Sequence, residues 1–125
     1  MRRSLLKLVL GMVVALMPMT TLMAEIAPRE KARIEALIAD VGSLGEAKFI
    51  RNGSSHDPAT AVKFLRGKWN AKTTEISTAE EFIAKAATIS ATTGQPYLIR
   101  MKDGTEKKCA DYMNEKLKQI DAAAK

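Results

Sequence analysis

Residues 97–104 read Tyr-Leu-Ile-Arg-Met-Lys-Asp-Gly, and they contain the clearest strand pattern in the chain. The first five are aromatic, branched or long apolar side chains around one arginine, which suits a pleated and partly buried strand. Asp103 and Gly104 form a dipeptide that is typical of tight hairpin turns. The pattern therefore predicts a strand over residues 97–101 and a short return strand after Gly104.

A second strand is predicted upstream, where residues 48–51 read Lys-Phe-Ile-Arg. Asn52 and Gly53 follow directly and form a turn signal. Residues 49–50 and 98–99 are the only strand-like pairs with enough apolar character to lie at the centre of a sheet. We therefore expect the two strands to be neighbours and to run antiparallel.

Four other stretches have apolar residues spaced three and four apart, which is the period of an amphipathic helix. Start signals precede three of them: Pro28, the pair Asp57-Pro58, and the capping box from Thr78 to Glu81. The fourth stretch runs from about residue 110 to residue 123. The fold class predicted is α+β, with about four helices packed on a small two- to three-stranded, mostly antiparallel sheet.

Residues 1–24 have the pattern of an export signal. A basic start with Arg2, Arg3 and Lys7 precedes an apolar run over residues 8–17, and Ala24 supplies a small residue for cleavage. The run is shorter than the roughly 20 residues of a transmembrane helix, although an uncleaved membrane anchor stays the alternative. We expect a cleaved signal peptide over residues 1–24, a periplasmic location without membrane attachment, and one small α+β domain over residues 25–125.

Charge and cysteine content exclude several classes of function. The chain has 20 Lys and Arg residues against 14 Asp and Glu residues, and three of the basic residues lie in residues 1–24. The remaining charges are interspersed, without the basic stripe and interleaved aromatics typical of nucleic-acid binding. Cys109 and His56 are the only residues of their types, which excludes an internal disulfide and a Cys/His zinc site. We expect no cofactor, no metal and no nucleic-acid partner.

Several strings, in their order and spacing, carry a resemblance to a known family. They are Phe-Ile-Arg-Asn-Gly at 49–53 with His56, Phe-Leu-Arg at 64–66 with Lys68, Ile-Ser-Thr-Ala-Glu at 76–80 with Phe-Ile at 82–83, and Gly-Gln-Pro-Tyr-Leu-Ile at 94–99. Together they resemble the YfeK-like family of short exported proteobacterial proteins of unknown function. The resemblance implies a periplasmic protein with a signal peptide, and it implies no catalytic or binding residue.

The chain departs from this family in one loop. Family members are serine-rich before a Gly-Lys-Pro-Tyr string, whereas residues 88–93 here read Thr-Ile-Ser-Ala-Thr-Thr and Gln95 replaces the usual lysine. The departure argues against a serine nucleophile or a phosphate-binding cradle in this loop.

Arg51, Asn52, His56 and Tyr97 form the candidate ligand-binding site. The turn at Asn52 ends one predicted strand and carries His56 back over it. Pro96 fixes the entry of the other strand, which brings Tyr97 to the same edge if the strands are antiparallel. We therefore expect these four side chains to gather at one end of the sheet. A hydrogen-bond network that pins the turn is the alternative role.

Two further hypotheses use the same region. In the first, His56 acts as a general base and Ser54 or Ser55 acts as the nucleophile. The alternative is a histidine that is held by local hydrogen bonds and has no catalytic role. Arg51 and Arg100 are expected on one face if their strands pair, where they would bind a carboxylate or phosphate. Ordinary solvated ion pairs are the alternative for both arginines.

Cys109 is the candidate reactive thiol. Lys107 and Lys108 precede it and a helix is expected to begin just after it, and both features lower the pKa of a thiol. A small side chain that caps the helix is the alternative, and no second cysteine exists to complete a redox cycle. An exposed Cys109 would also permit a disulfide between two chains.

The sequence lacks a recognisable set of nucleophile, base and acid. The function predicted is therefore a small, non-enzymatic periplasmic binding or accessory protein of unknown ligand. Its expected partner is an unknown periplasmic protein or envelope ligand, and the chain is expected to be a monomer or a weak homodimer that associates through its last helix. The alternative function is a small cell-envelope hydrolase or transferase that uses His56 with a nearby serine.

Overall fold

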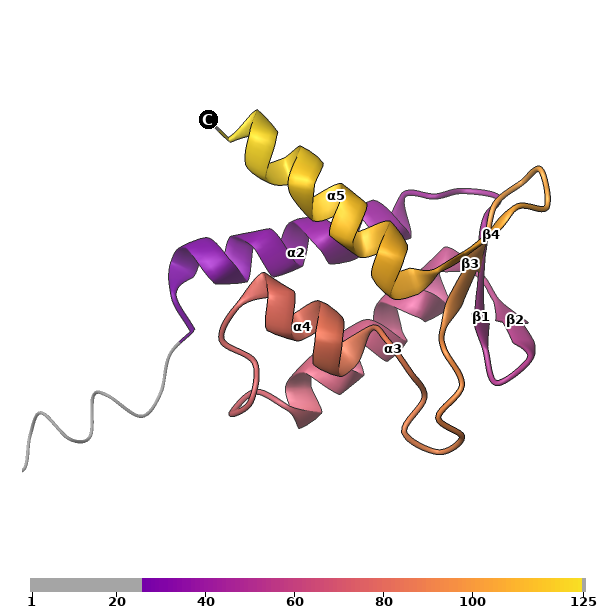
Figure 1. Cartoon of the computed structure of the whole chain (residues 1–125), viewed down its shortest axis with the longest axis horizontal. Helices are drawn as coiled ribbons and strands as arrows, with labels where there is room; N and C mark the ends of the chain where they lie inside the picture. Colours follow the sequence, from indigo (N-terminus) through magenta and orange to yellow (C-terminus); the bar gives the residue numbers. More distant parts are fainter. Residues whose placement is uncertain (1–25, 125) are drawn as a thin grey trace, which may run out of the picture.

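Residues 26–124 are described by the computed structural model, and they form the α+β fold that the sequence predicts (Figure 1). The helices of this part are α2 (Pro28–Gly42), α3 (Pro58–Ala71), α4 (Ala79–Ala86) and α5 (Cys109–Ala123). The strands are β1 (Lys48–Arg51), β2 (Ser54–His56), β3 (Leu98–Arg100) and β4 (Glu106–Lys108). The expected signal peptide lies outside the described residues. None of the helices in residues 26–124 is long and apolar enough to cross a membrane.

The sheet has the strand order β2-β1-β3-β4, and every neighbouring pair is antiparallel. The predicted pairing of β1 with β3 is confirmed, with Phe49 opposite Ile99 in its register. The return strand after Gly104 is also confirmed as β4.

Strand β2 is the one addition to the predicted two or three strands. Asn52 and Gly53 both have positive φ angles, 52° and 78°, which is the backbone of a two-residue hairpin turn. The chain therefore returns at once along β1 and pairs Ser55 with Ile50. The sequence does not predict this strand because Ser-Ser-His has no apolar alternation, and β2 is an exposed edge held by backbone bonds to β1.

The four helices lie on one side of the sheet, as Figure 1 shows. Their apolar stripes meet the inner sheet face in one hydrophobic core. The largest fully buried apolar side chains are Phe82, Ile34, Leu37, Ile38, Leu65, Ile76, Ile99 and Met113. Helix α3 contacts β1 and helix α5 contacts β3, which fixes the sheet relative to the helices.

Two helix starts are confirmed by their caps. The Asp57 carboxylate accepts a hydrogen bond from the Thr60 amide at 2.8 Å, at the start of α3. The Thr78 hydroxyl accepts one from the Glu81 amide at 3.1 Å, at the start of α4. Such caps satisfy amides that have no partner inside the helix.

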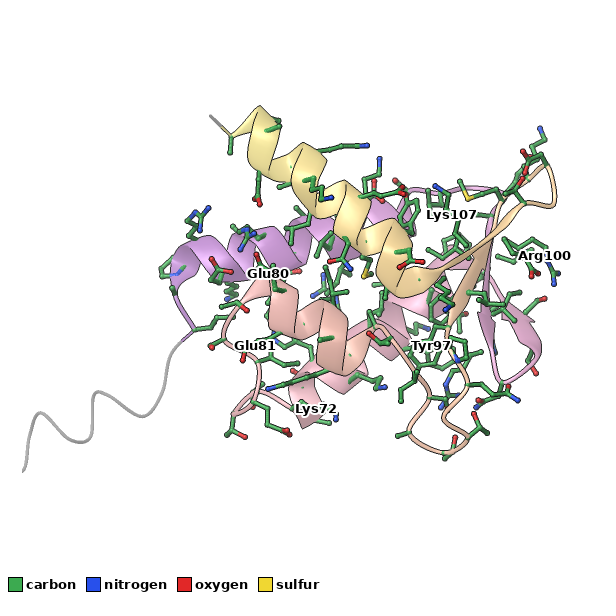
Figure 2. All side chains as sticks on the ribbon, viewed as in Figure 1. Lys72, Glu80, Glu81, Tyr97, Arg100 and Lys107 are labelled. Carbon is green, nitrogen blue, oxygen red and sulfur yellow. The ribbon has the colours of Figure 1, made fainter. Side chains whose placement is uncertain are left out.

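One arginine ties three helices together. Arg33 of α2 donates two hydrogen bonds to Asp121 of α5, at 3.0 and 2.9 Å, and two to Glu80 of α4, both at 3.1 Å. It also donates to Glu30 at 2.6 Å, and Glu30 accepts a bond from the amide of Ala79. The Arg33 side chain is only 10 % exposed, and these three carboxylates hold its pKa above the ordinary value. Figure 2 labels Glu80 where the start of α4 approaches α2.

Candidate functional site

A surface pocket of about 180 Å³ lies where the end of β1, helix α3 and the loop over residues 89–97 meet. We call it the β1–α3 pocket. Its walls combine two cationic, two aromatic and two small loop side chains: Arg51, Phe64, Lys68, Ala91, Thr92 and Tyr97. Figure 2 labels Tyr97, where the chain enters β3 between the helices and the sheet.

Arg51 forms one wall of this pocket. It is the last residue of β1, and its guanidinium carbon lies 4.7 Å from the centre of the Phe64 ring on α3. A guanidinium in this position is stabilised by the ring face, and the planar group keeps its N–H donors for other partners. Among residues 26–124, no carboxylate pairs with Arg51, so its charge is not neutralised by this part of the chain.

Lys68 and Tyr97 also line the pocket. Lys68 lies one helical turn after Phe64, and its Nζ donates to the Tyr97 hydroxyl and to the Ile89 carbonyl, each at 3.0 Å. The ammonium group has a third proton, and no acid within residues 26–124 takes it. Because the Tyr97 hydroxyl accepts from Lys68, its own proton stays available as a donor.

The 89–97 loop is held in place by its own hydrogen bonds and by the hairpin. Ile89 and Pro96 close the loop as a bridge, and the hydroxyl of the buried Ser90 bonds to the Thr92 hydroxyl at 2.9 Å. The side-chain amide of Asn52 bonds to the hydroxyls of Thr92 and Thr93. Asn52 therefore fastens the loop to the hairpin tip, and Ser90 stabilises the loop from inside.

His56 lies beside the pocket rather than in its wall. It pairs with Phe49 in the sheet, and its ring meets the Phe64 ring edge-to-face at 4.9 Å between centroids. Within residues 26–124, the His56 ring forms no hydrogen bond to a hydroxyl or a carboxylate. Ser55 points to the opposite sheet face, because successive side chains of a strand alternate.

The four predicted site residues thus share one region but have different roles. Arg51 and Tyr97 line the pocket, and the register of β1 and β3 places them across from each other. Asn52 supports the pocket through the loop. His56 lies in the edge strand β2 opposite Phe49, and it reaches the same region through Phe64.

The expectation that Arg51 shares a sheet face with Arg100 is wrong. Arg100 pairs with Lys48, three residues before Arg51, so the two arginines fall on opposite faces. Arg100 instead binds Glu106 of the neighbouring strand at 2.7 Å. Only Arg51 therefore contributes to the pocket.

Sequence reasoning did not select Phe64 and Lys68 as site residues. Both lie outside the buried stripe of α3, which is formed by Ala61 and Leu65. The available signal is a phenylalanine off the apolar stripe with a lysine four residues later, a spacing that places both on one helix face.

The comparisons with known proteins bear on this geometry. A model of a family of unknown function, DUF5329, matches residues 28–121 of the chain. The chain belongs to this family. A similar relative is the "Uncharacterized protein YfeK" of Salmonella typhimurium, 37% identical over 92 residues, which cover 74% of this chain and 77% of the relative. The YfeK-like resemblance is thereby confirmed. No solved structure matches the chain.

Another hollow of this DUF5329 member is a weaker candidate for a site. A larger hollow of about 360 Å³ between α2 and α3 includes Arg66, but Glu35 already neutralises that arginine at 2.8 Å. Residues 26–124 contain no cluster of three or more His, Cys, Asp or Glu side chains that could hold a metal ion.

The expectation of a reactive Cys109 is contradicted by its position. Cys109 is the first residue of α5, but its side chain is completely buried. Burial raises the pKa of the thiol to about 12, because the thiolate would lose its hydration, and this opposes any lowering by the helix or the nearby lysines. A buried thiol also cannot reach a second chain in the folded protein.

We expect iodoacetamide to label Cys109 at pH 8 at least on the order of a thousandfold more slowly in the native chain than in the urea-unfolded chain. A thiol with a pKa of about 12 has about a thousandth of the thiolate of one at 9.0, and burial hinders access further. Mass spectrometry of timed samples measures both rates. Equal rates in the two states would contradict the burial of Cys109.

Proposed function

We propose that this protein is a small periplasmic binding or accessory protein without catalytic chemistry of its own, and that its ligand binds in the β1–α3 pocket. The single observation that supports this most directly is the pair of cations, Arg51 and Lys68, which meet in one aromatic-walled hollow without a carboxylate partner in the described chain. Unpaired charges beside apolar walls are costly for folding alone and are typical of ligand sites.

The hydrogen bonds that hold the 89–97 loop in place support a binding role. The Asn52 side chain holds the 89–97 loop against the hairpin and the Ser90 hydroxyl bonds within the loop, so the walls are formed before any ligand arrives. Preformed walls reduce the ordering cost of binding. The periplasmic location is supported by the signal pattern over residues 1–24 and by Ala24 at its end.

The location is tested by expressing the full chain in a Gram-negative host and separating the periplasm by osmotic shock. We expect the periplasmic fraction to contain a chain that begins at residue 25, as measured by intact mass. A full-length chain that stays with the cytoplasm or the membrane would overturn the exported part of the proposal.

The binding role is tested by nuclear magnetic resonance on the isotope-labelled chain from residue 25 onward. Adding the low-molecular-mass fraction of a periplasmic extract is expected to shift the amide signals of Arg51, Thr92 and Tyr97. The shifts should disappear in Lys68→Ala and persist in Lys63→Ala, because Lys63 is an exposed lysine of the same helix outside the pocket.

Two results would overturn this role. One is an absence of shifts at the pocket with extracts from several growth conditions. The other is turnover of a peptidoglycan fragment by the purified chain that is lost in His56→Ala, which would indicate the hydrolase or transferase alternative.

A further inference from the structure

We infer that the β1–α3 pocket binds a monocarboxylate that carries a small apolar or aromatic group, as a free organic acid or as the C-terminal residue of a peptide. This inference rests on the proposed binding function and assigns the ligand class of the same site. It depends on three features of the pocket: its hydrogen-bond donors, its apolar walls and its size.

The free polar groups of the pocket are mainly donors. Arg51 offers the N–H groups of a guanidinium that has no acid partner within residues 26–124, Lys68 offers one ammonium proton, and Tyr97 offers its hydroxyl proton. The Thr92 hydroxyl is already engaged with Ser90 and Asn52. A site that offers two positive charges and several donors selects an anionic acceptor and disfavours an amine.

The free donors of the pocket can satisfy both oxygens of a carboxylate. Two of the three Lys68 protons are already used inside the protein, at Ile89 and Tyr97. Arg51 is therefore the one group with two free parallel donors, which matches the two oxygens of a carboxylate. A phosphate can use the same guanidinium pair, so phenyl phosphate is the competing probe in the test.

The walls determine the rest of the ligand. The Phe64 ring, the Tyr97 ring and the Ala91 methyl group line the pocket beside the cations. A volume of about 180 Å³ is smaller than the roughly 300–1,000 Å³ of drug-sized ligand sites, so one ring or one short aliphatic group fills it. The carboxylate would sit at the Arg51 guanidinium, and the apolar group would lie against the apolar part of the lining.

Four probes with related structures test the ligand class. Each is titrated into the chain from residue 25 onward, and binding is measured by calorimetry or by nuclear magnetic resonance. Phenylacetate is compared with phenylacetamide, which has the same body without the charge. Acetyl-Ala-Phe with a free C-terminal carboxylate is compared with its C-terminal amide. We expect each carboxylate to bind at least tenfold more tightly than its amide. Tighter binding of the peptide acid assigns a peptide terminus, and equal or tighter binding of phenylacetate assigns a free acid.

Variants of the pocket supply the residue-level evidence. Arg51→Ala is expected to weaken phenylacetate binding at least tenfold, and Arg51→Lys is expected to weaken it less, because lysine keeps the charge but loses the planar donor pair. Arg29→Ala is the matched control, since Arg29 is an exposed arginine far from the pocket lining, and binding should be unchanged. Circular dichroism spectra that match the wild type show that each variant is folded.

The outcomes separate this inference from the proposed function. If the amides or phenethylamine bind in the pocket as tightly as the acids, the ligand class is wrong although the binding function stands. Tighter binding of phenyl phosphate than of phenylacetate would also overturn the carboxylate assignment. If none of these probes binds while the periplasmic extract still shifts the pocket signals, the inference fails and the proposed function does not.

Discussion

Phe82→Ala is expected to lower the free energy of unfolding by about 3–5 kcal/mol, which is a large share of the roughly 5–15 kcal/mol that stabilises a small domain. Phe82 has no exposed surface, and its ring lies 5.9 Å from the Trp69 ring in an edge-to-face contact between α4 and α3. Truncation removes the buried ring and leaves a cavity in the middle of the helical layer, which the short α4 cannot close. Urea unfolding followed by circular dichroism measures the loss.

Phe64→Ala is the matched control for this prediction. It deletes the same ring from the half-buried wall of the β1–α3 pocket, where solvent can fill the space. We expect less than half of the stability loss of Phe82→Ala, together with a loss of ligand binding. A larger loss for Phe64→Ala than for Phe82→Ala would contradict this placement of the core.

Arg33→Ala is expected to lower the free energy of unfolding by about 2–4 kcal/mol, or to lower the melting temperature by roughly 10–20 °C. The substitution leaves Glu30, Glu80 and Asp121 close together without their shared cation. Glu30 is itself mostly buried, so its carboxylate loses a partner where hydration is poor. Thermal unfolding at neutral pH provides the measurement.

Arg29→Ala again serves as the control, because Arg29 also contacts Glu30 but its side chain is 74 % exposed. Exposed ion pairs contribute little, and we expect a change of no more than about 0.5 kcal/mol. An Arg29→Ala effect as large as that of Arg33→Ala would show that the three-helix cluster does not depend on the buried guanidinium.

The same cluster predicts a pH dependence. The Arg33 guanidinium holds the pKa of Glu80 below its ordinary value of 4.5 in the folded chain. This contribution to stability is present above pH 4.5 and is lost as the pH falls and Glu80 takes up a proton. Stability of the wild type should therefore fall more steeply with acidification than stability of Arg33→Ala, which lacks the largest cause of the lowered Glu80 pKa.

The central strands and the helices were predictable because their signals are local. Residues 98–100 and 48–51 have the composition of strands, and Asp57 and Thr78 are caps that act within one turn of chain. Strand β2 was not predictable in this way. Its polar residues pair only because the positive φ angles of the Asn52 turn return the chain alongside β1.

The sequence predicted the strand residues of the candidate site but not its helix residues, for a related reason. Arg51 and Tyr97 follow from the pairing of two recognisable strands, whose register brings them to one end of the sheet. Phe64 and Lys68 belong to α3, and nothing local in the sequence says which part of the sheet that helix covers. The face of Arg100 was predicted wrongly because a face depends on register, and a shift of one residue reverses it.

The sequence by itself determined the α+β class, the two central strands and the helix starts, because each of these depends on patterns within short segments. The family followed from the order and spacing of several such segments. Tertiary structure alone decided the environment of individual side chains. Packing buried Cys109 and raised its pKa, brought three carboxylates to Arg33, and placed Arg51 and Lys68 in one hollow with no acid partner among residues 26–124. These outcomes depend on distances between segments far apart in the chain, and both hydration and Coulomb energy are set by those distances.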